Sequence, residues 1–185
     1  AGDNAFALPA YAEAASYYQL AVTRLEQSHA VDEQAHLNDL LERLGECSKN
    51  SGSYEKATDI YTRLLHLRQQ TAKHGDPRFE AQVQALLWDE TCWTWRYRGD
   101  IQRAWQCCQQ GEHILRTAQI GDGPACARLY YTRSNLYLSE GQYDRALEYA
   151  RGSLTLLSSP GLRTDSESLL DRKVGKTLIQ RTLDG

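Results

Sequence analysis

Apolar residues recur at steps of three and four along two stretches of the chain that a glycine separates. Before Gly52 these positions are Leu37, Leu40, Leu41 and Leu44, and after it they are Ile60, Tyr61, Leu64 and Leu65. Such spacing places each set on one face of an α-helix. A glycine between two helices can adopt the left-handed conformation that ends the first helix and lets the chain turn back. The pattern therefore predicts an antiparallel helical hairpin packed through its apolar faces.

The hairpin signature occurs three times along the chain. Segments 52–57, 99–104 and 141–146 each contain a glycine, an apolar residue two positions later, then a basic residue and an alanine. A fourth, truncated copy lies at 11–14, beside a helix-forming run that follows Pro9. The alanines at 14, 57, 104 and 146 are 42 to 47 residues apart. Self-similarity at such a period predicts a stack of helical hairpins.

Glycine, proline and capping residues mark the boundaries between the repeats. Segment 75–77 supplies a helix-ending glycine, an aspartate that can cap the next helix and a proline suited to its first turn, and 121–124 is a close variant. Thr164 and Glu167 form a capping box that opens a last helix. We therefore expect about eight helices in a single domain: a partial repeat at 8–30, repeats at about 33–75, 76–121 and 122–158, and a C-terminal helix at 164–183.

The repeat resembles the tetratricopeptide repeat (TPR), whose first helix (helix A) carries a large residue, Leu-Gly and an aromatic, and whose second (helix B) carries alanines and an aromatic. The copy that matches best has Leu41, Leu44, Gly45, Gly52, Tyr54, Ala57 and Tyr61. The resemblance covers nearly the whole chain and implies an all-α fold, a right-handed α-solenoid of stacked antiparallel hairpins. It also implies that a small residue at 45, 92 or 134 packs against the alanine at 57, 104 or 146.

The repeats are longer than the 34 residues of the family unit, because helix B and its exit are extended. Such long repeats resemble the helical sensor regions of large bacterial signal-transducing ATPases of the STAND type. This second resemblance implies a signalling role in a bacterial protein.

In TPR arrays the A helices line a concave surface that binds partners, so the resemblance implies a partner-binding groove there. Carried over residue by residue, its candidate residues are Arg43, Glu46, Asp89, Trp93, Arg96, Tyr97, Arg128, Tyr131 and Asn135, with Asp39, Glu42, Lys49 and Leu138 beside them. Asn135 matches a position that hydrogen-bonds the ligand backbone in the family. Arg128 matches one basic position of the family's two-carboxylate clamp, but Glu42 and Glu46 replace its lysine and asparagine. A partner of mixed charge is therefore expected.

Trp93 has two interpretations. Trp88 and Trp95 fall at core positions of the repeat, whereas Trp93 falls on the groove side with Arg96 and Tyr97 near it. An exposed tryptophan beside an arginine would anchor a bound peptide. Alternatively, Trp93 packs against a neighbouring helix because the long repeats twist the array differently.

Composition narrows the choice of partners. The net charge of -3 and the pI near 6.0 provide no positive field for nucleic acid or for an anionic membrane. No membrane-spanning or export segment is visible in the sequence. Five cysteines without a C-x-x-C pair suggest neither a disulfide framework nor a zinc site, which favours the reducing cytoplasm. Because the chain has no methionine, we expect it to be a piece of a larger protein.

No pattern for catalysis stands out. The chain has no phosphate-binding loop, no nucleophile elbow and no H-E-x-x-H, and its scattered histidines lack partners that would complete a metal site. Cys107 and Cys108 point about 100° apart on a helix, which favours core packing over a redox pair. We expect no enzyme activity, no cofactor and no metal. Asp89 and Glu90 are the nearest candidates for catalytic carboxylates.

Together these features favour a scaffold or regulatory module of a cytoplasmic protein, whose concave face binds a protein, a peptide or another domain of the parent protein. The alternative is a small-ligand sensor domain of a bacterial transcriptional or signalling regulator, which would have an enclosed pocket beside Trp93 and Tyr131. An unrecognised enzyme is the remaining possibility. Cut ends of a repeat array expose apolar faces, so the oligomeric state is left open.

Overall fold

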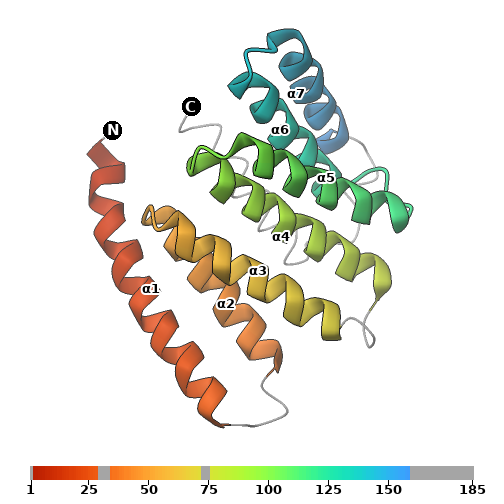
Figure 1. The fold of residues 1–185 in the computed structure, drawn as a ribbon. Coiled ribbons are helices and arrows are strands. Elements are labelled where there is room, and N and C mark those ends of the chain that lie inside the picture. Colours follow the sequence, from red (N-terminus) through yellow and green to blue (C-terminus); the bar gives the residue numbers. More distant parts are fainter. Residues whose placement is uncertain (1, 29–33, 72–75, 159–185) are drawn as a thin grey trace. The chain divides into compact units, whose positions relative to one another are not determined.

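The computed structural model describes residues 2–28, 34–71 and 76–158, and the helix predicted at 164–183 lies outside them. Within these ranges the fold is all-α, as predicted, with seven helices and no strand (Figure 1). The helices are α1 (Gly2–Ser28), α2 (Gln34–Asn50), α3 (Tyr54–Thr71), α4 (Pro77–Tyr97), α5 (Ile101–Thr117), α6 (Pro124–Ser139) and α7 (Tyr143–Leu157). None of these helices is long and apolar enough to cross a membrane.

Helix α1 begins at Gly2, ahead of Pro9, which the sequence placed in the first turn of this helix. Pro9 therefore lies inside the helix instead of in its first turn. A proline removes one backbone donor, but the many alanines around it have the highest helix propensity of all residues. The helix continues through the proline for this reason.

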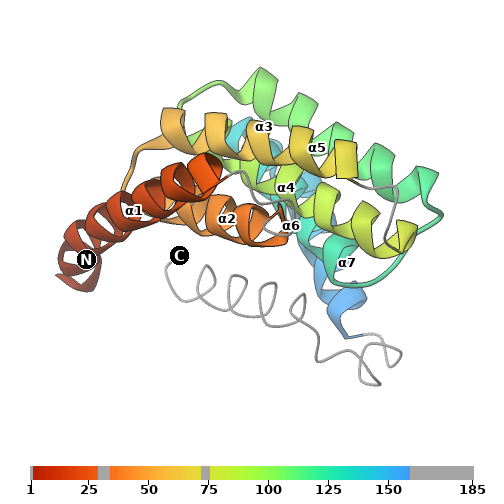
Figure 2. The same cartoon turned by 90° about the horizontal axis from the view of Figure 1, so that it is seen from below.

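The described chain folds into two compact units, and α4 contributes to both. The first unit consists of α1, α2, α3 and residues 93–100, and the second consists of residues 76–92 with α5, α6 and α7. In the first unit α2 packs against α1 and α3, and in the second α6 packs against α5 and α7 (Figures 1 and 2). The pairs α2–α3, α4–α5 and α6–α7 each fall inside one predicted repeat. A single domain built from these repeats stays a prediction.

Left-handed glycines end α2, α4 and α6, where the repeat pattern places them. The angle φ is +81° at Gly52, +83° at Gly99 and +74° at Gly141. In each turn the residue after the glycine donates its N–H to the carbonyl five residues back, as Ser53 does to Ser48 at 2.8 Å. This bond satisfies a carbonyl that the end of the helix would leave without a donor. The predicted role of these three glycines is confirmed.

Gly99→Ala tests this role, because an added Cβ would meet no atom within 4 Å. Only the left-handed backbone then opposes the alanine, and we expect the free energy of unfolding to fall by about 1 to 2 kcal/mol. Gly121→Ala is the matched control, since position 121 is equally open but its φ is not left-handed. Urea unfolding followed by circular dichroism compares the two variants. Equal losses in both would contradict the assignment.

Small residues let paired helices approach each other closely. A Cβ at Gly45 of α2 would lie 2.6 Å from the ring of Tyr61 on α3, so only glycine fits there. Ser134 of α6 donates a hydrogen bond to the carbonyl of Ala146 on α7 at 2.8 Å. All six positions predicted to form close crossings, 45, 57, 92, 104, 134 and 146, are buried. The contact between 134 and 146 is confirmed, whereas the side chain against Gly45 is Tyr61, one helical turn beyond Ala57.

Candidate functional site

The residues predicted to line the groove differ widely in exposure. Arg43, Glu46 and Tyr97 are exposed, Arg96, Tyr131 and Asn135 are half-buried, and Asp89, Trp93 and Arg128 are buried. Only 0% of Asp89, 3% of Trp93 and 4% of Arg128 is accessible to solvent. The expectation that these three side chains face a partner in an open groove is therefore corrected. Partner binding by the other six stays a prediction.

Trp93 packs inside the first compact unit. Its ring lies against that of Tyr97, with centroids 5.8 Å apart, and Tyr97 stacks on Tyr54 of α3 at 4.9 Å. The guanidinium carbon of Arg96 is 5.1 Å from the centroid of the Trp93 ring. Trp93 and Tyr97 share a face because they are one helical turn apart on α4. Of the two interpretations of Trp93, packing is the one that the structure supports.

Arg128 and Asp89 pair with each other inside the second compact unit, and the pair offsets the cost of burying their charges. Arg128 Nε lies 2.7 Å from Asp89 Oδ2, its Nη2 pairs with Glu90, and Thr132 donates a hydrogen bond to Asp89. Burial alone would lower the pKa of Arg128, but the charges and hydrogen bonds of Asp89 and Glu90 outweigh it and hold this pKa above its ordinary value. Arg128 stays charged and ties α6 to α4. Both carboxylates considered as catalytic candidates are thus engaged by one arginine.

The cysteines are buried thiols. All five are buried and none forms a disulfide. Burial raises the pKa of the Cys108 thiol well above its usual range, and burial together with Asp122 raises the pKa of Cys126 to about 11. Thiols that stay protonated at neutral pH are poor nucleophiles and poor metal ligands. In the part of the chain that the structure describes, no three His, Cys, Asp or Glu side chains gather as a metal site would require.

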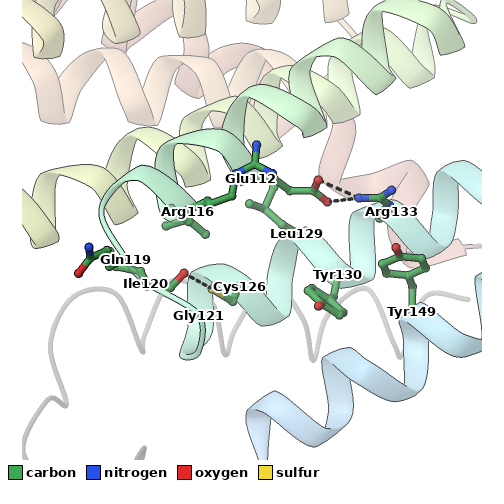
Figure 3. Close-up of a pocket in the computed structure, with 11 residues that line it drawn as sticks. Glu112, Arg116, Gln119, Ile120, Gly121, Cys126, Leu129, Tyr130, Arg133 and Tyr149 are labelled. Atoms are coloured by element: carbon green, nitrogen blue, oxygen red, sulfur yellow. Dashed lines mark hydrogen bonds and ion pairs between the residues drawn. The ribbon is translucent and has the colours of Figure 1, made fainter.

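The second compact unit contains a pocket of about 490 Å³, which we call the α5–α6 pocket. Its walls are the end of α5, the connection to α6, the first turns of α6 and one residue of α7 (Figure 3). The lining residues are Glu112, Leu115, Arg116, Gln119, Ile120, Gly121, Cys126, Leu129, Tyr130, Arg133 and Tyr149. Its volume lies within the range of roughly 300 to 1,000 Å³ that is typical of ligand pockets.

The inner wall of the pocket is apolar and well packed. It is formed by the buried side chains of Leu115, Ile120 and Leu129. The rings of Tyr130 and Tyr149 lie side by side, with centroids 5.4 Å apart (Figure 3). Gly152 of α7 makes room for Tyr130, because a Cβ there would come within 2.8 Å of its ring. An apolar side chain entering the pocket would meet a preformed wall.

Arg133 and Glu112 form one end of the pocket and neutralise each other (Figure 3). Arg133 Nη1 donates to both carboxylate oxygens of Glu112 at 2.8 Å. Its guanidinium carbon lies 4.7 Å from the centroid of the Tyr149 ring, a cation–π contact. Burial would lower the pKa of Arg133, but hydrogen bonds with Tyr137 and Glu112 raise it. Arg133 is therefore a fixed cation that holds Tyr149 in place.

Gln119 forms the opposite end of the pocket and has an unusual backbone (Figure 3). Within the described ranges it is the one residue other than glycine with a left-handed φ, +56°. Its N–H bonds to the carbonyl of Arg116 at 3.0 Å, and the N–H of Ile120 bonds to that of Leu115 at 2.9 Å. This is the turn that Gly52, Gly99 and Gly141 make elsewhere, with glutamine in the place of glycine.

Sequence reasoning missed this pocket because on α6 it assigned binding to positions 128, 131 and 135, whereas the pocket is lined by Leu129, Tyr130 and Arg133 of that helix. The pocket instead lies mainly on α5, on the connection to α6 and on one side of α6. The sequence placed a helix-ending glycine at 121, but the left-handed residue is Gln119, two positions earlier. The absence of a glycine at the end of α5, where the ends of α2, α4 and α6 have one, was the one sequence signal that could have indicated this pocket.

Comparison with known proteins supports the repeat and the fold. The tetratricopeptide repeat family matches residues 127–156, which cover most of α6 and α7. No curated protein is similar in sequence to this chain. The crystal structure of BtubC (BKLC) from P. vanneervenii is similar with a TM-score of 0.65 and 15% identity, over 91% of this chain and 64% of that one. At this identity the likeness is one of fold, and this chain spans less than two thirds of the length of that protein.

These comparisons and the paired helices together establish an all-α fold of the α-solenoid type that contains a tetratricopeptide-type repeat. Repeats of this type mediate protein–protein interactions, which indicates a protein-interaction scaffold.

Proposed function

We propose that this chain is a non-catalytic interaction module that holds a peptide segment of a partner protein. The observation that carries the proposal is the α5–α6 pocket, in which a preformed apolar wall lies beside polar groups at both ends. Peptide-binding sites share this combination of an apolar anchor pocket with a few hydrogen-bonding groups. Three of its lining residues, Leu129, Tyr130 and Arg133, lie on the part of α6 that the family matches. The partner is a separate protein or another domain of the parent protein.

The proposal includes a cellular setting. The chain would belong to a larger regulatory protein of the bacterial cytoplasm, similar to the helical sensor regions of STAND-type ATPases, which its long repeats support. Its net charge of -3 does not favour nucleic acid or membranes as partners. In this proposal, the accessible residues predicted for the A helices make further contacts with the partner: Arg43, Glu46, Arg96 and Tyr97 in the first compact unit, and Tyr131 and Asn135 in the second.

A small-ligand sensor has less support from the structure. It was expected to enclose its ligand beside Trp93 and Tyr131. Neither residue lines the α5–α6 pocket or the shallower pocket around residues 52–59 and Arg98. Trp93 is also buried against Tyr97. We therefore propose a peptide and not a metabolite as the ligand.

Tyr130→Ala tests the proposal. Peptides are first selected from a displayed library of random dodecapeptides on the immobilised full chain, and their Kd is then measured by calorimetry. Tyr130 forms a pocket wall and is 39% exposed, so the variant should fold and lose affinity by about tenfold or more. Tyr130→Phe keeps the ring and should retain binding. Circular dichroism confirms that each variant is folded.

Tyr143→Ala is the matched control for this measurement. Tyr143 is 69% exposed and does not line the pocket, so its removal should leave the Kd unchanged. Failure to select any peptide, or an unchanged Kd in folded Tyr130→Ala, would exclude the α5–α6 pocket as the binding site. A loss of binding in Tyr97→Ala instead would move the site to the predicted groove.

A further inference from the structure

We propose that the α5–α6 pocket recognises a peptide in which an apolar side chain is followed closely by an acidic residue. The inference rests on the proposed function and specifies its ligand. The apolar side chain would enter the wall of Leu115 and Leu129, and the carboxylate would pair with Arg116. Gln119 would hydrogen-bond the peptide backbone between them.

The charge of the pocket points to an acidic ligand. Three charged side chains line it, and two of them, Glu112 and Arg133, form an ion pair with each other. The third, Arg116, is exposed, and its side chain has no hydrogen bond or ion pair with any described residue. A guanidinium binds a carboxylate through paired, charge-assisted hydrogen bonds. The pocket thus presents one unneutralised positive charge, which attracts a carboxylate and repels a basic side chain.

Gln119 supplies groups that suit a peptide backbone. Its amide can donate and accept hydrogen bonds at the same time, as a peptide bond can. The side chain is exposed at the edge of the pocket and has no partner among the described residues. At three other helix ends the same position of the turn is a glycine, which has no side chain and tolerates the left-handed φ. Unfavourable backbone conformations of this kind cluster at binding sites, which supports a functional reason for glutamine here.

The remaining lining residues select an apolar anchor. Ile120 follows Gln119 and turns inward, where only 6% of it is exposed. Together with Leu115 and Leu129 it forms a surface without free polar side chains, and the rings of Tyr130 and Tyr149 flank it. At about 490 Å³ the pocket exceeds the volume of a single side chain, so it can hold an apolar residue and part of the adjoining peptide.

The composition of the selected dodecapeptides is the first test. We expect enrichment of leucine or an aromatic residue within about three positions of aspartate or glutamate. Arg116→Glu should weaken the binding of such a peptide by at least about tenfold. Arg151→Glu is the matched control, because it makes the same charge change at an exposed residue of α7 that does not line the pocket. It should leave the Kd within about twofold.

A charge swap makes the assignment specific to Arg116. A second synthetic peptide, with lysine in place of each acidic residue, should bind the wild-type chain poorly and the Arg116→Glu variant better. Gln119→Gly should weaken the affinity for the acidic peptide several-fold, although glycine tolerates the left-handed φ at this position better than glutamine does. A glutamine with only a structural role would not produce this combination.

The outcomes separate this inference from the proposed function. Peptides that depend on Tyr130 but are neutral or basic, or that bind Arg116→Glu unchanged, would overturn the acidic ligand and leave the peptide-binding pocket standing. If the selected peptides bind Tyr130→Ala with unchanged Kd, or if the library yields no binding peptide, both the acidic ligand and the peptide-binding pocket are overturned. Enriched acidic peptides with the predicted charge swap support both.

Discussion

Arg128→Met is expected to lower the free energy of unfolding by about 3 to 5 kcal/mol. The substitution keeps an apolar side chain of similar length but leaves the buried carboxylate of Asp89, and the nearby one of Glu90, without their cation. Removing one partner of a buried pair costs far more than removing an exposed charge, because the remaining charge cannot return to water. Urea unfolding followed by circular dichroism measures the loss.

Arg151→Met is the matched control for Arg128→Met. Arg151 lies on the exposed side of α7, so its replacement should change the free energy of unfolding by no more than about 0.5 kcal/mol. If the free energy of unfolding falls by the same small amount in both variants, the buried ion pairs of Arg128 with Asp89 and Glu90 do not hold α4 and α6 together.

Trp93→Ala is expected to lower the free energy of unfolding by about 3 to 5 kcal/mol, because it leaves a cavity in the first compact unit. The large cost follows from the 3% exposure of Trp93 and from its contact with Tyr97. Tyr97→Ala, one turn further along the same face, should cost less, because Tyr97 is 47% exposed. A stable Trp93→Ala variant that had lost only partner binding would restore the groove interpretation of Trp93.

The helical hairpins could be predicted because their signals are local in sequence. Gly52, Gly99 and Gly141 lie between apolar stripes of helical period, and the left-handed conformation that each adopts is open to few other residues. Gly45 was assigned to a close helix crossing for the same kind of reason, although its neighbour is Tyr61 and not Ala57. The start of α1 was predicted wrongly because Pro9 was given more weight than the alanines around it.

The burial of Asp89, Trp93 and Arg128 could not be predicted from the repeat alone. Arg128 pairs with Glu90, and Thr132 pairs with Asp89, across 38 and 43 residues of sequence. A single sequence shows that such residues are polar, but it does not show which polar residues meet. A charged residue on the expected concave side of helix A was therefore assigned to a partner, whereas its real partners are within the chain.

The α5–α6 pocket depends on a conformation that the sequence does not favour at that position. Left-handed backbone is uncommon in residues other than glycine, so the sequence did not identify Gln119 as the residue that ends α5 and brings Ile120 inward. The absence of a glycine there was the one signal that the sequence offered. The ion pair of Glu112 with Arg133 joins two helices across 21 residues, and the fixed position of Tyr149 follows from it. The site arises from these tertiary contacts and not from the repeat pattern.

A crystal structure of the full chain with a selected peptide would show where the peptide binds. We expect an apolar side chain of the peptide between Leu115, Leu129 and Tyr130, with a peptide carboxylate within hydrogen-bonding distance of Arg116. Peptide density on any other surface, with the α5–α6 pocket empty, would contradict this expectation.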